Sequence, residues 1–164
     1  MSTIEVSRIA LLSQQTFDGE PWYGLALCKL LAGVTAEQAA AHPIPGAHSI
    51  WQEVLHAMTW RNVAIRLLNG EKVAPVKAEE NWPNPPAPPA AAAWEETLTE
   101  LSRTQGQFAA ALVALSDERL NDIAAQRPSP FTFYTLVHGV IQHDAYHAGQ
   151  IALLKNAAGI SQQS

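Results

Sequence analysis

The sequence predicts an all-α protein, a four-helix bundle whose helices run in up-down-down-up order. Helical periodicity continues through most of the 164 residues, and the alternating apolar pattern typical of strands is nearly absent. A stripe typical of helix bundles, with alternating spacings of four and three, crosses residues 91–115. A proline-rich segment over residues 70–90 separates the second and third long helices. We therefore expect residues 1–164 to form a single domain, with residues 70–90 as a linker within it.

The first helix is expected over residues 3–18. Gly19 and Pro21 interrupt it, because proline removes a backbone donor and glycine favours turns. The apolar pattern resumes over residues 21–31, so the helix is predicted to be kinked or broken. Gly33 is the expected C-terminal cap of this second part.

A short helical turn is predicted over residues 36–41, followed by a loop that contains two prolines. Ser49 then begins the second long helix. Gln52 follows three residues later, which is the capping-box pattern, and the helix is expected to end at Asn69 and Gly70. The last helix is predicted to begin near Ser129 or Thr132 and to end before Gly159.

The proline-rich segment decides the predicted order of the helices. An extended chain of about 20 residues, at roughly 3.1 Å per residue, reaches about twice the length of a 20-residue helix. It can therefore return to the end where the preceding helix began, so residues 49–69 and 91–115 should run parallel. The segment contains the prolines Pro75, Pro83, Pro85, Pro86, Pro88 and Pro89.

Charge and composition exclude several classes of function. The net charge of −5 and the scattered basic residues argue against a nucleic-acid partner. The first residues show no basic segment followed by an apolar stretch, and no apolar run approaches the length of a membrane span. Cys28 is the only cysteine, so an intrachain disulfide is impossible, and we expect a buried packing role for it. These features predict a cytoplasmic protein with no membrane partner.

Two histidines continue the apolar stripe of the last helix. The stripe consists of Phe133, Leu136, Val140, Ile151 and Leu154. Its spacing places His143 and His147 in the gap, so both imidazoles should face the core. Residues four apart on a helix lie on one face, about 6 Å apart, a span that one metal ion can bridge. His138 is about half a turn out of phase with His147 and is excluded.

A third histidine, His56, lies on the apolar side of the second long helix, beside Trp60. His42 and His48 lie in or near the proline-containing loop and should face solvent. Three neutral imidazoles in a core would leave buried nitrogens unsatisfied, at roughly 1–3 kcal/mol each. One divalent cation would satisfy all three. We therefore predict that His56, His143 and His147 bind one divalent metal ion.

Three known patterns compete for these histidines. The segment from His143 to His147 resembles the H-E-x-x-H motif of zinc proteases, but Asp144 replaces the glutamate and no downstream ligand follows. Glu53 and His56 form an E-x-x-H, the di-iron motif, but its partner is missing and the third long helix offers Gln105 instead of a glutamate. Both patterns are therefore weaker than the third.

The third pattern consists of residues 48–56, His48-Ser-Ile-Trp-Gln-Glu-Val-Leu-His56, and residues 143–151, His143-Asp-Ala-Tyr-His147-Ala-Gly-Gln-Ile151. Together they resemble the DinB/YfiT-like family of metalloenzymes. The likeness extends to Leu-Ala-Gly-Val-Thr-Ala-Glu-Gln-Ala ahead of Pro43 and so covers most of the chain. The resemblance implies an up-down-down-up four-helix bundle, a metal triad at His56, His143 and His147, nickel or zinc as the metal, and a homodimer.

The resemblance also implies a small-molecule substrate. Characterised relatives include transferases and isomerases that depend on mycothiol, bacillithiol or glutathione, so a low-molecular-weight thiol is one expected partner. Metal-assisted hydrolysis fits three neutral ligands equally well. The alternative is a non-catalytic metal-binding protein with a stress-response or structural role. Asp144 and Gln105 are the candidates for a catalytic role near the metal, and Trp60 or Gln105 should wall a pocket above it.

Overall fold

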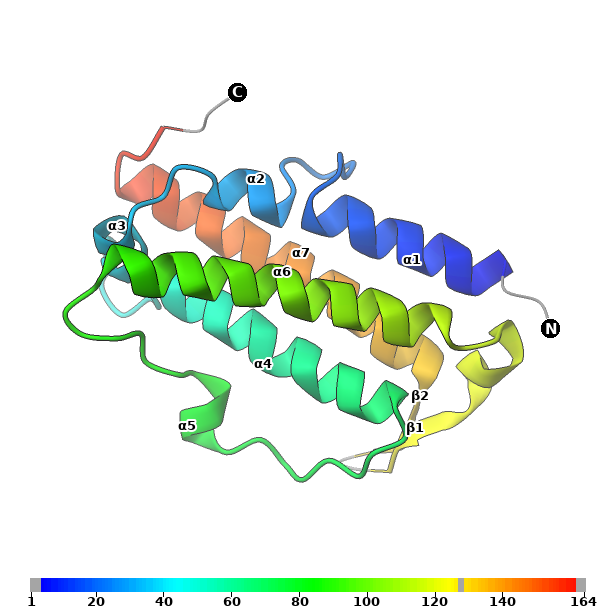
Figure 1. Cartoon of the computed structure of the whole chain (residues 1–164). Helices are drawn as coiled ribbons and strands as arrows, with labels where there is room; N and C mark the ends of the chain where they lie inside the picture. Colours follow the sequence, from blue (N-terminus) through cyan, green and yellow to red (C-terminus); the bar gives the residue numbers. More distant parts are fainter. Residues whose placement is uncertain (1–3, 127–128, 162–164) are drawn as a thin grey trace.

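The computed structural model describes residues 4–126 and 129–161, and these residues are mostly helical, as the all-α prediction requires. Four helices of 14 to 25 residues lie side by side in Figure 1. They are α1 (Ile4–Phe17), α4 (Ile50–Leu68), α6 (Ala91–Val113) and α7 (Phe133–Ala157). The shorter elements are α2 (Leu27–Leu31), α3 (Ala36–Ala40), α5 (Ala78–Asn81), the 3-10 helix η1 (Asp117–Asn121), β1 (Ile123–Ala125) and β2 (Phe131–Thr132).

In Figure 1, α4 and α6 both begin at the left and end at the right, whereas α1 and α7 run in the opposite direction. Helix α4 packs against both α6 and α7, and α1 packs against the same two helices. Helices α6 and α7 therefore each lie between α1 and α4. No helix within the described ranges is long and apolar enough to cross a membrane.

Side-chain caps fix the starts of two long helices. The Ser49 hydroxyl accepts from the Gln52 N–H at 3.2 Å, and the Gln52 side chain accepts from the Ser49 N–H at 3.0 Å, so the predicted capping box begins α4. The Thr132 hydroxyl accepts from the Thr135 N–H at 3.2 Å and begins α7. Thr132, rather than Ser129, is thus the start of the last helix.

The N-terminal region differs from its prediction. The expected start at residue 3 lies outside the described residues, and α1 ends at Phe17. The expected second part, residues 21–31, is helical only in α2, from Leu27. Gly24 has a φ of 144°, outside the helical region, so the turn that follows Pro21 continues through it. The prediction of a helix from residue 21 was wrong for this reason.

The core has two apolar clusters with a polar layer between them. One cluster includes Trp51 and Ile151, and the other includes Phe108 and Val137. On each of the four long helices, buried polar side chains lie between residues of one cluster and residues of the other. These polar side chains are Ser13 and Thr16 on α1, Arg61 on α4, Thr104 and Gln105 on α6, and Asp144 and His147 on α7. The polar layer places hydrogen-bonding groups at mid-bundle, where the predicted metal ligands also lie.

Two segments carry structure that the sequence did not predict. The proline-rich segment passes outside α4 in Figure 1, but it includes the short helix α5 and is not extended throughout. Strands β1 and β2 pair antiparallel, with Ile123 opposite Thr132 and Ala125 opposite Phe131. This small hairpin leads directly into α7.

Candidate metal centre

Three imidazoles from two helices converge at the middle of the bundle. His56 projects from α4, and His143 and His147 project from α7 one turn apart. Nε2 of His143 lies 3.1 Å from Nε2 of His56 and 3.0 Å from Nε2 of His147. The candidate ligand atoms of the three residues all lie within 4.8 Å of one another. The predicted triad is thus close enough to hold one metal ion, and His138 lies outside it.

The outer nitrogens of two of the rings are already hydrogen-bonded. His56 Nδ1 lies 2.6 Å from the Asn81 carbonyl oxygen, and His147 Nδ1 lies 2.5 Å from Glu53 Oε2. A carbonyl oxygen and a carboxylate accept hydrogen bonds, so each Nδ1 carries the proton and each Nε2 presents a lone pair. This fixes both rings with the lone pair directed at the convergence point.

The donor set fits a cation better than it fits hydrogen bonding alone. If Nε2 of His143 carried a proton, it could donate that proton to only one of its two neighbours, His56 or His147. At least one buried lone pair would then lack a donor among these rings. A divalent cation would accept lone pairs from all three nitrogens, as imidazole ligands of zinc and nickel do.

Burial favours the neutral form of the His56 and His143 rings. Burial, followed by the neighbouring imidazoles of His147 and His56 and by the Arg61 guanidinium, lowers the pKa of His143 to about 3. Burial is also the main cause that lowers the pKa of His56. Neutral imidazole is the form that binds metal, so proton competition at His143 is weak at neutral pH.

The proline-rich segment covers the centre and is more than the plain linker that we expected. The Trp82 ring stacks between His48, at 3.6 Å between ring centroids, and His56, at 3.9 Å. The Trp60 indole N–H donates to Asn81 Oδ1 at 2.8 Å. His48, expected to face solvent, therefore stacks on Trp82, and the segment positions His56 from outside the bundle.

Asp144 and Gln105 belong to the polar layer behind the imidazoles. Asp144 is buried and accepts from Arg61 Nη2 at 2.7 Å. Gln105 donates to the Ser13 hydroxyl at 3.0 Å. Arg61 Nε and Nη1, Asp144 Oδ1 and Gln105 Oε1 have no hydrogen-bond partner among the described residues. Asp144, a candidate for a catalytic role, is thus held in a buried ion pair with Arg61 through its Oδ2.

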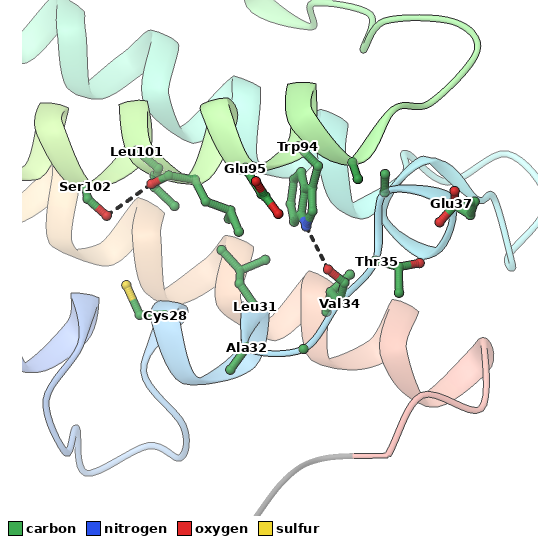
Figure 2. Close-up of a pocket in the computed structure, with 14 residues that line it drawn as sticks. Cys28, Leu31, Ala32, Val34, Thr35, Glu37, Trp94, Glu95, Leu101 and Ser102 are labelled. Carbon is green, nitrogen blue, oxygen red and sulfur yellow. Dashed lines mark hydrogen bonds between the residues drawn. The ribbon is translucent and has the colours of Figure 1, made fainter.

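A cavity of about 330 Å³ adjoins the centre between α4 and α7. His143 and Trp60 both line it, whereas Gln105, the other expected wall residue, points into the polar layer. A second cavity, of about 560 Å³, lies between α2 and α6 (Figure 2). Its lining includes Cys28 and Trp94 but none of the three histidines. Cys28 is half-buried at this cavity rather than fully packed in the core.

Residues 26–151, most of the chain, match the sequence profile of the DinB superfamily. The chain belongs to the DinB superfamily. All three histidines of the candidate centre lie within the matched residues, as do Glu53 and the segment that carries Asn81 and Trp82. Membership in the DinB superfamily confirms the family that the sequence motifs resemble. No curated protein and no solved structure matches the chain.

Sequence reasoning missed the residues that orient the histidine rings. Glu53 was considered only as part of a di-iron motif, but its carboxylate bonds Nδ1 of His147, on the far side of the ring from Nε2. Its position three residues before His56 was the available signal. Asn81 contributes a backbone oxygen, and a motif of side chains in the sequence cannot predict such a contact.

Proposed function

We propose that this protein is a metal-dependent enzyme that acts on a small molecule. His56, His143 and His147 would hold one divalent ion, nickel or zinc. The observation that carries the proposal is the convergence of three Nε2 atoms, two of whose rings, those of His56 and His147, are already oriented by Asn81 and Glu53. Among the described residues, this is the one group of three or more metal-binding side chains within ligand distance.

The proposed chemistry follows from the donor set. Three neutral imidazoles leave the charge of a divalent ion uncompensated and leave positions open for other ligands, since a closed structural zinc site usually has four protein ligands. When bound, such an ion would lower the pKa of a coordinated water or thiol and polarise a carbonyl. The proposed reactions are thiol-dependent S-transfer or isomerisation, which the family resemblance favours, and hydrolysis.

The residues of the chain would support this chemistry in distinct ways. Glu53 and Asn81 hold the rings of His147 and His56 in the tautomer with Nε2 free. Trp82 covers one side of His56, which limits access of water from the side of the proline-rich segment. The cavity, which His143 lines, would bring a substrate to the His143 side of the centre.

We further propose an up-down-down-up bundle, a cytoplasmic location and a homodimer. The helix directions in Figure 1 support the order of the bundle. The location and the homodimer rest on the lone Cys28 and on the family resemblance, respectively. The second candidate function is a non-catalytic metal-binding role. The buried Arg61–Asp144 pair favours this non-catalytic role, because Asp144, a candidate for a catalytic role, is held in an ion pair with Arg61.

Elemental analysis of protein purified without an affinity tag tests the proposal first. Wild type should carry about one divalent ion per chain, and His143→Ala should carry less than about a tenth of that. His138→Ala is the matched control on the same helix and should load as wild type does. All three proteins should remain helical by circular dichroism. A wild type that binds no divalent metal would overturn the proposed centre.

A panel of thiols with electrophiles, together with esters, tests catalysis. The thiols should include mycothiol, bacillithiol and glutathione. We expect turnover in wild type and in His138→Ala, and its loss both with a chelator and in His143→Ala. Metal binding without any metal-dependent turnover across the panel would favour the non-catalytic role instead.

A further inference from the structure

The cavity beside His143 has an almost wholly apolar wall. It is formed by Trp60, Val63 and Leu67 of α4 and by Phe131, Leu136 and Val140 of β2 and α7. Its volume of about 330 Å³ is at the lower end of the range of roughly 300–1,000 Å³ found for small-molecule sites. The cavity is therefore large enough for a small ligand but not for a cofactor of nucleotide size.

No free charge faces the cavity. Arg61 is the charged residue that lines it, and its Nη2 is paired with Asp144 at 2.7 Å. Its Nε and Nη1 have no hydrogen-bond partner among the described residues, but the side chain is 0% exposed, so these nitrogens are closed off from a ligand in the cavity. The polar groups of the lining are the His143 ring and the Thr135 hydroxyl, which lies 3.3 Å from the Thr132 hydroxyl. A charged ligand would lose its hydration in this cavity without gaining an ionic partner. Transfer of an apolar ligand from water into the cavity is favourable.

We propose that this cavity binds the apolar body of an uncharged small molecule and presents the reactive end of that molecule to the His143 side of the metal centre. The inference rests on the proposed function, because it assigns the substrate class of that site. In a thiol-dependent reaction, the cavity would take the uncharged apolar reactant. A charged thiol such as glutathione would have to lie outside it.

Gly139 provides a specific way to test the cavity. It lines the wall on α7, and a Cβ placed on it would meet no atom within 4 Å. The Cβ of a leucine at this position therefore has open space, and we expect the rest of the side chain to occupy part of the cavity. Gly149 lies on the same helix, has the same open surroundings and lines a different cavity, so Gly149→Leu is the matched control. Both replacements remove a helical glycine, which favours the helix.

The experiment measures binding of the neutral fluorescent probe N-phenyl-1-naphthylamine to metal-free and metal-loaded protein, with metal content determined for every variant. Gly139→Leu should weaken probe binding at least about tenfold, and Gly149→Leu should change it less than about twofold. 1-Hexanol should displace the probe and hexanoate should not. Across 1-butanol to 1-hexanol, each added methylene should strengthen displacement about fourfold.

Equal probe binding by Gly139→Leu and wild type would overturn the inference, as would equal displacement by hexanoate and hexanol. If Gly139→Leu fails to fold by circular dichroism, Gly139→Met provides the same test with a flexible side chain. The two proposals fail separately. If metal loading is normal but the Gly139 variant and hexanoate do not give the expected changes in probe binding, the proposed substrate class alone is wrong. If probe binding is as expected but the protein binds no metal, the proposed metal centre is wrong and an apolar ligand site remains.

Discussion

Glu53 on α4 and His147 on α7 are joined across the bundle by a hydrogen bond of 2.5 Å between Glu53 Oε2 and His147 Nδ1. Both side chains are buried, so the bond is shielded from solvent. Carboxylate groups behind histidine ligands commonly fix the ring and raise its basicity toward the metal. This pair therefore links the packing of two helices to the orientation of one predicted ligand.

Glu53→Ala should weaken metal affinity by about 10- to 100-fold, because His147 would lose the acceptor that orients its ring. Glu53→Gln should weaken it less, since the amide oxygen can still accept from Nδ1. Competition against a chromophoric chelator measures both affinities. Affinity in Glu53→Ala equal to that of wild type would show that His147 is held by packing alone.

Trp82→Ala should weaken metal affinity several-fold and leave the helices intact. The change removes the ring stacked on His56 at 3.9 Å but leaves the backbone of the segment in place. Trp82→Phe keeps an aromatic ring and should retain most of the affinity. The same competition assay gives the affinities, and thermal unfolding followed by circular dichroism controls for the fold. A drop in affinity matched by a large loss of thermal stability would contradict a local role.

Removing either partner of the Arg61–Asp144 pair should destabilise the fold. Each single variant, Arg61→Met or Asp144→Leu, leaves a buried charge unpaired and should lower the free energy of unfolding by about 3–5 kcal/mol. The double variant removes both charges, and its loss in free energy of unfolding should be much smaller than the sum of the losses in the two single variants. Urea unfolding in the presence of a chelator measures the stability apart from metal binding. Additive losses in the double variant would argue against a direct interaction.

Cys28 should react slowly with alkylating reagents in the folded protein. Burial, followed by the charge of Asp18, raises the pKa of its thiol to about 11, although Arg61 partly opposes the shift. A raised thiol pKa keeps the unreactive protonated form to higher pH. At pH 8 the folded protein should therefore alkylate about a hundredfold more slowly than the unfolded chain.

The rate for folded protein should rise about tenfold per pH unit up to about pH 11, if the fold persists. Iodoacetamide labelling followed by intact-mass spectrometry gives the rates, and urea-unfolded protein is the reference. Fast labelling of folded protein near pH 8 would contradict the raised pKa.

The helices and the histidine triad followed from periodicity because both depend on which side chains share a helix face. The Ser49 capping box and the core-facing positions of His143 and His147 needed no knowledge of the rest of the fold. The break after α1 was predicted at Gly19 and Pro21, but the start of α2 was misplaced, because the φ of Gly24 depends on the local turn rather than on an apolar pattern. Local and periodic signals were therefore reliable, and turn geometry was not.

The surroundings of the triad depend on contacts between distant segments. The bonds from His147 to Glu53 and from His56 to Asn81 span 94 and 25 residues, so no local pattern predicts them. The Arg61–Asp144 pair was missed for the same reason, because each residue alone reads as a polar position on a helix. Only the packing of α4 on α7 shows that they meet.

The oxygen that orients His56 belongs to the main chain of Asn81, and any residue at that position would supply it. Substitutions can therefore accumulate there with little effect on this bond, provided that the segment keeps its course. An insertion or deletion of one residue between Gly70 and Asn81 would instead move the carbonyl by up to about 3.8 Å, the spacing of successive Cα atoms. The length of this segment, more than its composition, is thus what would keep His56 oriented toward the proposed metal centre.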